Sequence, residues 1–180
     1  MTRVTSFMHC ALFALAAALA CDAVNAHSAS DAYLTLVEPA RADQTRTETV
    51  LHVQWDIALR DLDFVLKLDD DGDGNIVWGE LRKHQKAIAH YAFQYLKASG
   101  DGRSCRISPT GQKVDNHADG AYASLTFDIG CPGSPKRLGL DYRLFFAIDP
   151  SHRAIVVLHS ADNIATALLS SDKTQIDLGL

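Results

Sequence analysis

The stretch from Leu68 to Leu81 reads LDDDGDGNIVWGEL, and the interpretation of the whole chain starts from it. Counted from Asp69, acidic residues stand at positions 1, 3, 5 and 12, a glycine at position 6 and an isoleucine at position 8. Carboxylates two residues apart can wrap one side of a cation, and a glutamate at position 12 can close the other side. The spacing is typical of an EF-hand calcium loop.

The predicted ligands are the side chains or carbonyls of Asp69, Asp71, Asp73, Asn75 and Glu80. Asn75 contributes its backbone oxygen, and Glu80 contributes both carboxylate oxygens. Gly74 lets the chain turn sharply, while Val77 has no ligand atom, so a water would serve at that position. Hard oxygen donors in this number favour Ca²⁺ as the cofactor over Mg²⁺. The alternative is a solvated acidic turn.

Helical patterns flank this loop, and strand patterns surround the helices. Asp56 can cap a helix through IALRDLDFVL, and 80–98 carries an apolar stripe that stops before Gly100. Period-two or apolar runs predict strands at 31–38, 49–55, 103–108, 121–129, 138–148, 153–159 and 174–178. The predicted fold class is α+β, an antiparallel β-sheet or sandwich with an inserted helix–loop–helix (EF-hand) at about residues 56–98.

The loop has no second copy in the sequence. EF-hands usually pair through position 8, so Ile76 is expected to pack on the sheet or on a partner. A single loop has less room to act as an opening switch, and a structural role for the ion is at least as well supported as a sensor role.

The first 26 residues have the features of a secretory signal peptide. Arg3 precedes the apolar run CALFALAAALAC, and the small-residue site ends at Ala26. We therefore expect one periplasmic or secreted domain over residues 27–180. Lipid attachment at Cys21 is the weaker alternative, because Ala18 stands where such sites usually have leucine.

Cleavage would leave Cys105 and Cys131 as the cysteines of the mature chain. An even pair in an oxidising compartment predicts a Cys105–Cys131 disulfide. Two buried thiols or two metal ligands are the alternatives. Neither cysteine has a Cys or His at the short spacing of a zinc site, which disfavours the metal alternative.

Composition limits the partners. The chain has 180 residues and a formal net charge of −5, which argues against nucleic acid, because phosphate binding needs a basic surface. No apolar run reaches the roughly 20 residues that a membrane-spanning helix needs, so no transmembrane segment is expected in the mature chain. A membrane-protein partner remains compatible with this composition.

The histidines give an alternative function, the binding or delivery of a transition metal such as Ni or Cu. Those left after cleavage are His27, His52, His84, His90, His117, His152 and His159. His27, as the mature N-terminus, would offer an amine and a ring to one ion. His84 and His90 are six residues apart, which is not the spacing of a helical metal pair.

Enzyme motifs are absent from the sequence. It contains no G-x-S-x-G, H-E-x-x-H or phosphate-binding glycine loop, so a non-enzymatic protein is expected. A hydrolase is the third hypothesis, and a Ser/His/Asp cluster or a carboxylate pair in a pocket would favour it.

Four segments resemble the exported N-terminal region of HupE/UreJ-like membrane proteins. They are SDAYL (30–34), QWDIALRDLDF (54–64), LDDDGDGNIVWGEL (68–81) and LDYRLFFAIDPSHRAIVVL (140–158). In that family the region precedes a multi-helix membrane half thought to be a transporter. The resemblance implies a periplasmic calcium-binding domain, accessory to a transporter-like membrane protein, and it supplies no catalytic residues. This sequence ends at Leu180 without such a half.

Overall fold

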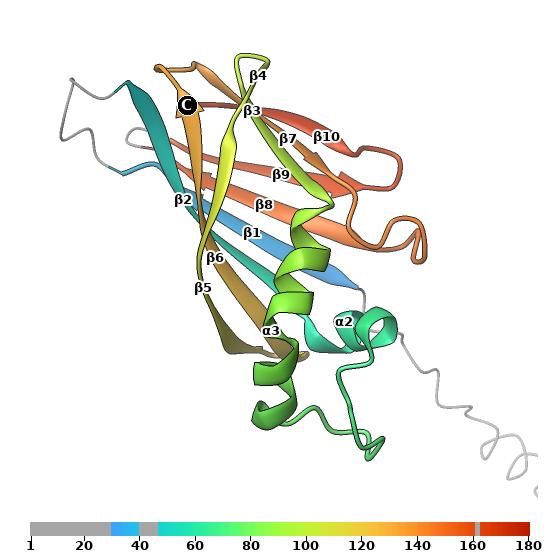
Figure 1. Ribbon diagram of the computed structural model, residues 1–180. Helices are drawn as coiled ribbons and strands as arrows, with labels where there is room; N and C mark the ends of the chain where they lie inside the picture. The colour runs from blue at the N-terminus through green and yellow to red at the C-terminus, as the bar shows by residue number, and fades with distance from the viewer. Residues whose placement is uncertain (1–29, 40–46, 161–162) are drawn as a thin grey trace, which may run out of the picture.

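The computed structural model describes residues 30–39, 47–160 and 163–180 (Figure 1). The predicted signal peptide, Cys21 and His27 lie outside these residues. The described elements are β1 (Asp31–Val37), β2 (Glu48–Ala58), α2 (Leu59–Leu66), α3 (Trp78–Phe93), β3 (Leu96–Gly100), β4 (Arg103–Ser104), β5 (Arg106–His117), β6 (Gly120–Pro132), β7 (Arg137–Tyr142), β8 (Arg153–His159), β9 (Ile164–Ser170) and β10 (Gln175–Gly179).

The strands form two sheets. The larger has the order β5-β6-β2-β1-β8-β9, and the smaller has the order β10-β7-β3-β4. β1 pairs antiparallel with β2 and parallel with β8, so the larger sheet is mixed. In Figure 1, α3 and the smaller sheet lie over the same face of the larger sheet, and α3 leads directly into β3.

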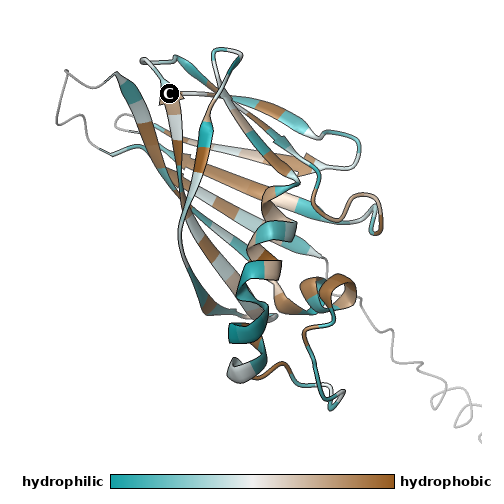
Figure 2. Ribbon diagram, in the orientation of Figure 1, coloured by the Kyte–Doolittle hydropathy of each residue, from teal (hydrophilic) through white to brown (hydrophobic). Residues whose placement is uncertain are grey.

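Alternating apolar side chains build the core between these layers. Figure 2 shows alternating hydrophobic and hydrophilic segments along the strands of the larger sheet. In β2 the buried apolar side chains include Leu51, Val53, Trp55 and Ile57. The Trp55 ring joins the layers, because its centroid lies 6.1 Å from that of Phe93 at the end of α3 and 5.7 Å from that of Tyr142 at the end of β7.

The predicted α+β class is wrong. The described residues are mainly strand, in one mixed and one antiparallel sheet, and only α2 and α3 among them are α-helical. An inserted EF-hand helix–loop–helix is not shown either, since α2 has only eight residues. β2 continues to Ala58, and its residues Asp56 and Ile57 pair with both β1 and β6. These ladder hydrogen bonds hold the backbone extended where the sequence predicted a helix start.

Two further boundaries differ from the prediction. α3 ends at Phe93, whereas the predicted helix covers 80–98. The residues from Leu96 to Gly100 pair instead with β7 as strand β3. The strand predicted at 138–148 ends at Tyr142, and a turn follows in which Phe145 has a φ of 63°.

The remaining differences concern sheet edges. β9 was not predicted, and β5 extends to His117, well past the predicted end at Ser108. Both are edge strands of the larger sheet, so only one side of each is paired within it. β5 carries an irregularity between Pro109 and Gly111, two residues that argue against a strand in sequence. Burial along β5 does not alternate regularly, and in β9 apolar residues such as Ile164 and Leu168 lie on the exposed face, so the hydropathy of neither strand shows a clear period of two.

Cys105 and Cys131, the pair predicted to be bonded, form a disulfide in the structure, with a Cα–Cα distance of 4.4 Å. Cys131 belongs to β6 of the larger sheet, and Cys105 lies between β4 of the smaller sheet and β5 of the larger one. The backbone N–H of Cys105 donates to the Ala98 carbonyl of β3 at 2.9 Å. The disulfide therefore links the two sheets at one end.

A membrane-crossing helix needs about 20 residues. Neither helix in the described part of the chain is long and apolar enough to cross a membrane.

Candidate functional site

Asp63 ties the acidic loop to the end of α2. Lys67 follows the helix with a left-handed φ of 53°. Oδ1 of Asp63 accepts hydrogen bonds from the backbone N–H groups of Leu68 at 2.7 Å and Asp69 at 3.1 Å. One carboxylate oxygen therefore fixes the place where the loop begins.

Two glycines turn the loop around the side chain of Asp69. Gly72 and Gly74 have φ values of 74° and 84°, which residues with a side chain rarely adopt. An added Cβ would meet no atom within 4 Å at either position, so the requirement for glycine is conformational. The N–H of Gly72 donates to Oδ1 of Asp69, and the N–H of Gly74 donates to its Oδ2, both at 2.8 Å.

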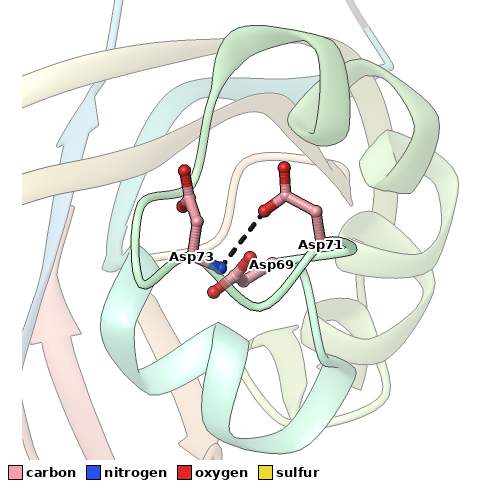
Figure 3. A group of neighbouring side chains, drawn as sticks. All are labelled: Asp69, Asp71 and Asp73. Atoms are coloured by element: carbon pink, nitrogen blue, oxygen red, sulfur yellow. Dashed lines mark hydrogen bonds between the residues drawn. The ribbon is translucent and has the colours of Figure 1, made fainter.

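The next two aspartates are held in the same way. Oδ1 of Asp71 accepts from the N–H of Asp73 at 3.2 Å, and Oδ1 of Asp73 accepts from the N–H of Asn75 at 2.7 Å. One oxygen each of Asp69, Asp71 and Asp73 lies within 4.8 Å of the others. Figure 3 shows these three side chains grouped around one turn of the loop. Within the described residues, no other three metal-ligating side chains converge in this way.

The electrostatics of this aspartate cluster favour a cation. The hydrogen bond from the backbone of Gly74 is the main cause that lowers the pKa of Asp69 below its ordinary value, so this carboxylate is charged at neutral pH. Three carboxylates so close together repel one another, and a divalent cation among them would relieve that repulsion.

Glu80 and Asn75 are the two predicted ligands outside the aspartate cluster. Glu80 is buried at the start of α3, and it is not part of the aspartate cluster. Its Oε1 accepts from the N–H of Asp70 at 2.8 Å and its Oε2 from the N–H of Val77 at 2.9 Å. The side-chain amide of Asn75 donates to the carbonyl of Asp73 at 3.4 Å. The side chains of three of the five predicted ligands therefore converge. Asn75 is predicted to contribute its backbone oxygen, which the hydrogen bond of its side chain does not test, and the ligand role of Glu80 stays a prediction.

Asp70 lies in the loop but faces α3. Its carboxylate accepts from Nε2 of His84 at 2.8 Å and from Nζ of Lys83 at 2.9 Å. These two hydrogen bonds, that of His84 first, lower the pKa of Asp70. An aspartate of the same loop with other partners provides a matched control for mutations of the cluster.

The apolar residues of the loop divide between core and solvent. Ile76 is partly buried and packs against the core, as expected for a loop without a paired copy. Trp78 has 52% of its surface exposed. An exposed indole in the first turn of α3 is suited to report on ion binding nearby.

The described histidines lie apart from the aspartate cluster. None of them belongs to a group of three or more converging ligands in the described part of the chain. His52 bonds to Asp128 at 2.7 Å, and the ring of His117 stacks on that of Tyr33 with centroids 5.1 Å apart. His27 lies outside the described residues.

A second polar cluster was not predicted from the sequence. Oγ of Ser30 lies 2.6 Å from Nδ1 of His152 and 2.8 Å from Oδ2 of Asp61. Nε2 of His152 lies 2.7 Å from the hydroxyl of Tyr142. Ser30 is 31 positions from Asp61 and 122 positions from His152 along the chain, so no local spacing links them. The one available signal is that each lies in a segment that carries the HupE/UreJ resemblance.

This second cluster contains the residue types of a hydrolase, but not their usual order. In a Ser-His-Asp triad the imidazole lies between the hydroxyl and the carboxylate. Here the Ser30 hydroxyl lies between the imidazole of His152 and the carboxylate of Asp61. His152 is fully buried, so its ring could not exchange protons with a substrate in solution. The geometry does not favour nucleophilic catalysis.

No protein-family model matches this chain, and a comparison with curated proteins finds no match either. The resemblance to the exported region of HupE/UreJ-like proteins therefore stays a prediction.

Proposed function

We propose that this chain is a non-enzymatic, exported module that binds one Ca²⁺ in the acidic loop Asp69–Glu80. The observation that carries the proposal is the convergence of Asp69, Asp71 and Asp73, whose oxygens lie within 4.8 Å of one another. Charged carboxylate oxygens are hard donors, the type that Ca²⁺ prefers.

The donor set fits the ion. The three aspartates would hold it on one side. Glu80 lies at the end of the same loop, and its carboxylate accepts hydrogen bonds from two backbone N–H groups. Bound Ca²⁺ would supply positive charge that orders the loop, and Asp63 would carry that order into α2. The ion's role is therefore structural, with any regulatory effect passing through α2.

Export and a membrane partner belong to the same proposal. The signal-peptide pattern of the first 26 residues supports a periplasmic or secreted location, and a disulfide is compatible with an oxidising compartment. The family resemblance supports an accessory role beside a transporter-like membrane protein. A pull-down from native membranes should recover that partner with calcium and lose it with EGTA. Equal recovery under both conditions would show that binding of the partner does not depend on calcium.

Terbium luminescence tests the calcium site directly. Tb³⁺ should show emission sensitised by Trp78, and Ca²⁺ should displace it. The sequence has two tryptophans; Trp78 stands two residues before the predicted ligand Glu80, whereas Trp55 belongs to β2, outside the acidic loop. Trp78→Phe should therefore remove the emission while calorimetry still detects Ca²⁺ binding.

Paired variants identify the ligands. Asp71→Asn should weaken Ca²⁺ binding at least tenfold, because it removes a charge from the cluster. Asp70→Asn is the matched control and should bind as wild type, because Asp70 bonds to α3 instead. Glu80→Gln should also weaken binding at least tenfold. Wild-type affinity in both Asp71→Asn and Glu80→Gln would overturn the site.

The same titration, carried out with Ni²⁺ or Cu²⁺, distinguishes the transition-metal alternative from calcium binding. Stoichiometric binding of Ni²⁺ or Cu²⁺ that survives Asp71→Asn and disappears in His27→Ala would favour it over calcium.

A further inference from the structure

A cavity of about 350 Å³ opens beside α2, away from the acidic loop in sequence. Three segments line it: the residue before β1, the helix α2, and the turn after β7. The lining residues are Ser30, Arg60, Asp61, Phe64, Phe145, Ile148 and Asp149. A concave site with an apolar wall and a few convergent polar groups is the usual form of a small-molecule site.

A chain of hydrogen bonds runs from the core to the polar side of the cavity. A consistent proton order runs from the Tyr142 hydroxyl to Nε2 of His152, from Nδ1–H to Oγ of Ser30, and from the Ser30 hydroxyl to Oδ2 of Asp61. Tyr142 and His152 are fully buried. The chain ends at the Asp61 carboxylate and fixes its position in the cavity.

The charge of the lining is negative. It contains one arginine and two aspartates, so it carries one net negative charge. Arg60 already pairs with Asp61, Nε to Oδ1 at 3.7 Å, and with Asp119, Nη2 to Oδ2 at 3.4 Å. Burial raises the pKa of Asp61, and the nearby charge of Asp149 acts in the same direction. A cation in the cavity would stabilise both carboxylates.

The apolar side is unusually open. Phe64 is 68% exposed and Ile148 is 49% exposed, although both are large apolar residues. Phe145 lies at a φ of 63°, a conformation that is strained for a residue with a side chain. Its ring lines the cavity and also packs edge-on against His152, with centroids 5.0 Å apart. Strained backbone and exposed apolar surface at one cavity point to a ligand site.

We propose that this cavity binds a small organic cation, a protonated amine attached to an aromatic or aliphatic body. The amine would pair with the carboxylates of Asp61 and Asp149, and the body would lie against Phe64, Phe145 and Ile148. The Phe64 ring already accepts one cation, since Nζ of Lys67 lies 5.6 Å from its centroid. An anionic ligand is disfavoured, because both carboxylates face it and Arg60 is engaged by Asp61 and Asp119.

Phenethylamine is the probe that tests this proposal, with 2-phenylethanol and 3-phenylpropanoate as the neutral and anionic comparators. Amide chemical shifts of the purified chain, recorded in EGTA, should move saturably in α2 and in the turn 143–152 with the amine. The alcohol should bind at least tenfold more weakly, and the carboxylate should not bind. EGTA removes the proposed calcium ion, so the shifts report binding of the amine and not a change in calcium occupancy.

Three variants and one control complete the experiment. Asp61→Asn keeps an oxygen acceptor for Ser30, and it should weaken amine binding at least tenfold, as should Asp149→Asn. Phe64→Ala should weaken it similarly without affecting the fold, because the side chain is mostly exposed. Ile164→Ala removes an exposed apolar side chain of β9 and should bind as wild type. Equal affinity for the amine and the alcohol, wild-type binding by Asp149→Asn and Phe64→Ala, or no saturable shift would overturn the proposal.

Discussion

At the scale of single residues, His152 links the stability of this protein to pH. Its ring bonds to Ser30 and Tyr142 and is fully buried. Burial is the largest cause that lowers the pKa of His152, to about 4, while the charges of Asp149 and Asp31 act in the opposite direction. The native state therefore keeps this histidine neutral over a pH range in which an unfolded chain protonates it.

This difference between the native and the unfolded state makes the protein less stable at acidic pH. Between the ordinary histidine pKa of about 6.5 and the native value, the unfolded state binds more protons, so the free energy of unfolding decreases as pH falls. The shift corresponds to about 3 kcal/mol lost across this window. Urea denaturation at a series of pH values measures it.

His152→Gln isolates this contribution, because other groups near the ring also titrate. The variant should show a flatter slope of stability against pH between about 6.5 and 4 than wild type does. The same slope in His152→Gln as in wild type would assign the pH dependence to other groups.

Residue patterns predicted one site but not the other. Asp69, Asp71 and Asp73 follow one another in a fixed spacing, so the sequence alone indicated that they converge. Ser30, Asp61 and His152 are brought together only by the sheets, and no spacing reveals that. Glu80 is intermediate, since its position in the loop was predicted while its hydrogen bonds to two backbone N–H groups were not.

At the scale of elements, α2 lies between the two candidate sites. Its residues Arg60, Asp61 and Phe64 line the cavity, whereas Asp63 holds the start of the acidic loop. A helix of two turns has little stability of its own, so contacts at both of its ends determine its position.

Asp63→Ala tests the anchoring of the loop by α2. The substitution removes the acceptor of two backbone N–H groups, and the loop should lose order without losing any proposed ligand. We expect Ca²⁺ affinity to fall severalfold in a terbium-displacement titration. Asp63→Asn, which retains an acceptor oxygen, should restore most of it. Unchanged affinity in Asp63→Ala would show that α2 does not position the loop.

Element boundaries were harder to predict than element types. Asp56 is a good helix cap by residue type, but the strand ladder continues through it to Ala58. Similarly, 96–100 continues an apparent helical stripe, yet pairing with β7 makes it a strand. Both errors have one cause, because strand pairing with distant segments outweighs local preference.

At the scale of the whole molecule, the disulfide fastens the smaller sheet to the larger one. Cys131 is fully buried and Cys105 nearly so, and the sequence separation is 26 residues. A cross-link of this size limits the freedom of the unfolded chain, with a stabilising effect of about 3–4 kcal/mol in the chain-entropy account.

The double variant Cys105→Ser/Cys131→Ser should lose about this much stability in urea denaturation of the purified protein, that is, about 3–4 kcal/mol. Wild type treated with a reductant should approach the same midpoint. Loss of less than about 1 kcal/mol would show that other contacts hold the two sheets together.

The class of the whole molecule was only partly accessible from sequence. The number of strand-like runs indicated sheets, but the sequence predicted longer helices around the acidic loop than α2 and α3, and this led to the α+β prediction. The parallel pairing of β1 with β8 has no local signature, since it joins residues about two-thirds of the chain apart.

That pairing has a consequence for how the protein is made. β1 lies between β2 and β8, so its partner on one side emerges from the ribosome long after β1 itself. Until β8 (Arg153–His159) has been synthesised, β1 has an unpaired edge that can pair with strands of other proteins. Such long-range closure also slows folding. A chain of this topology gains from being kept extended by a chaperone until its last third has been synthesised.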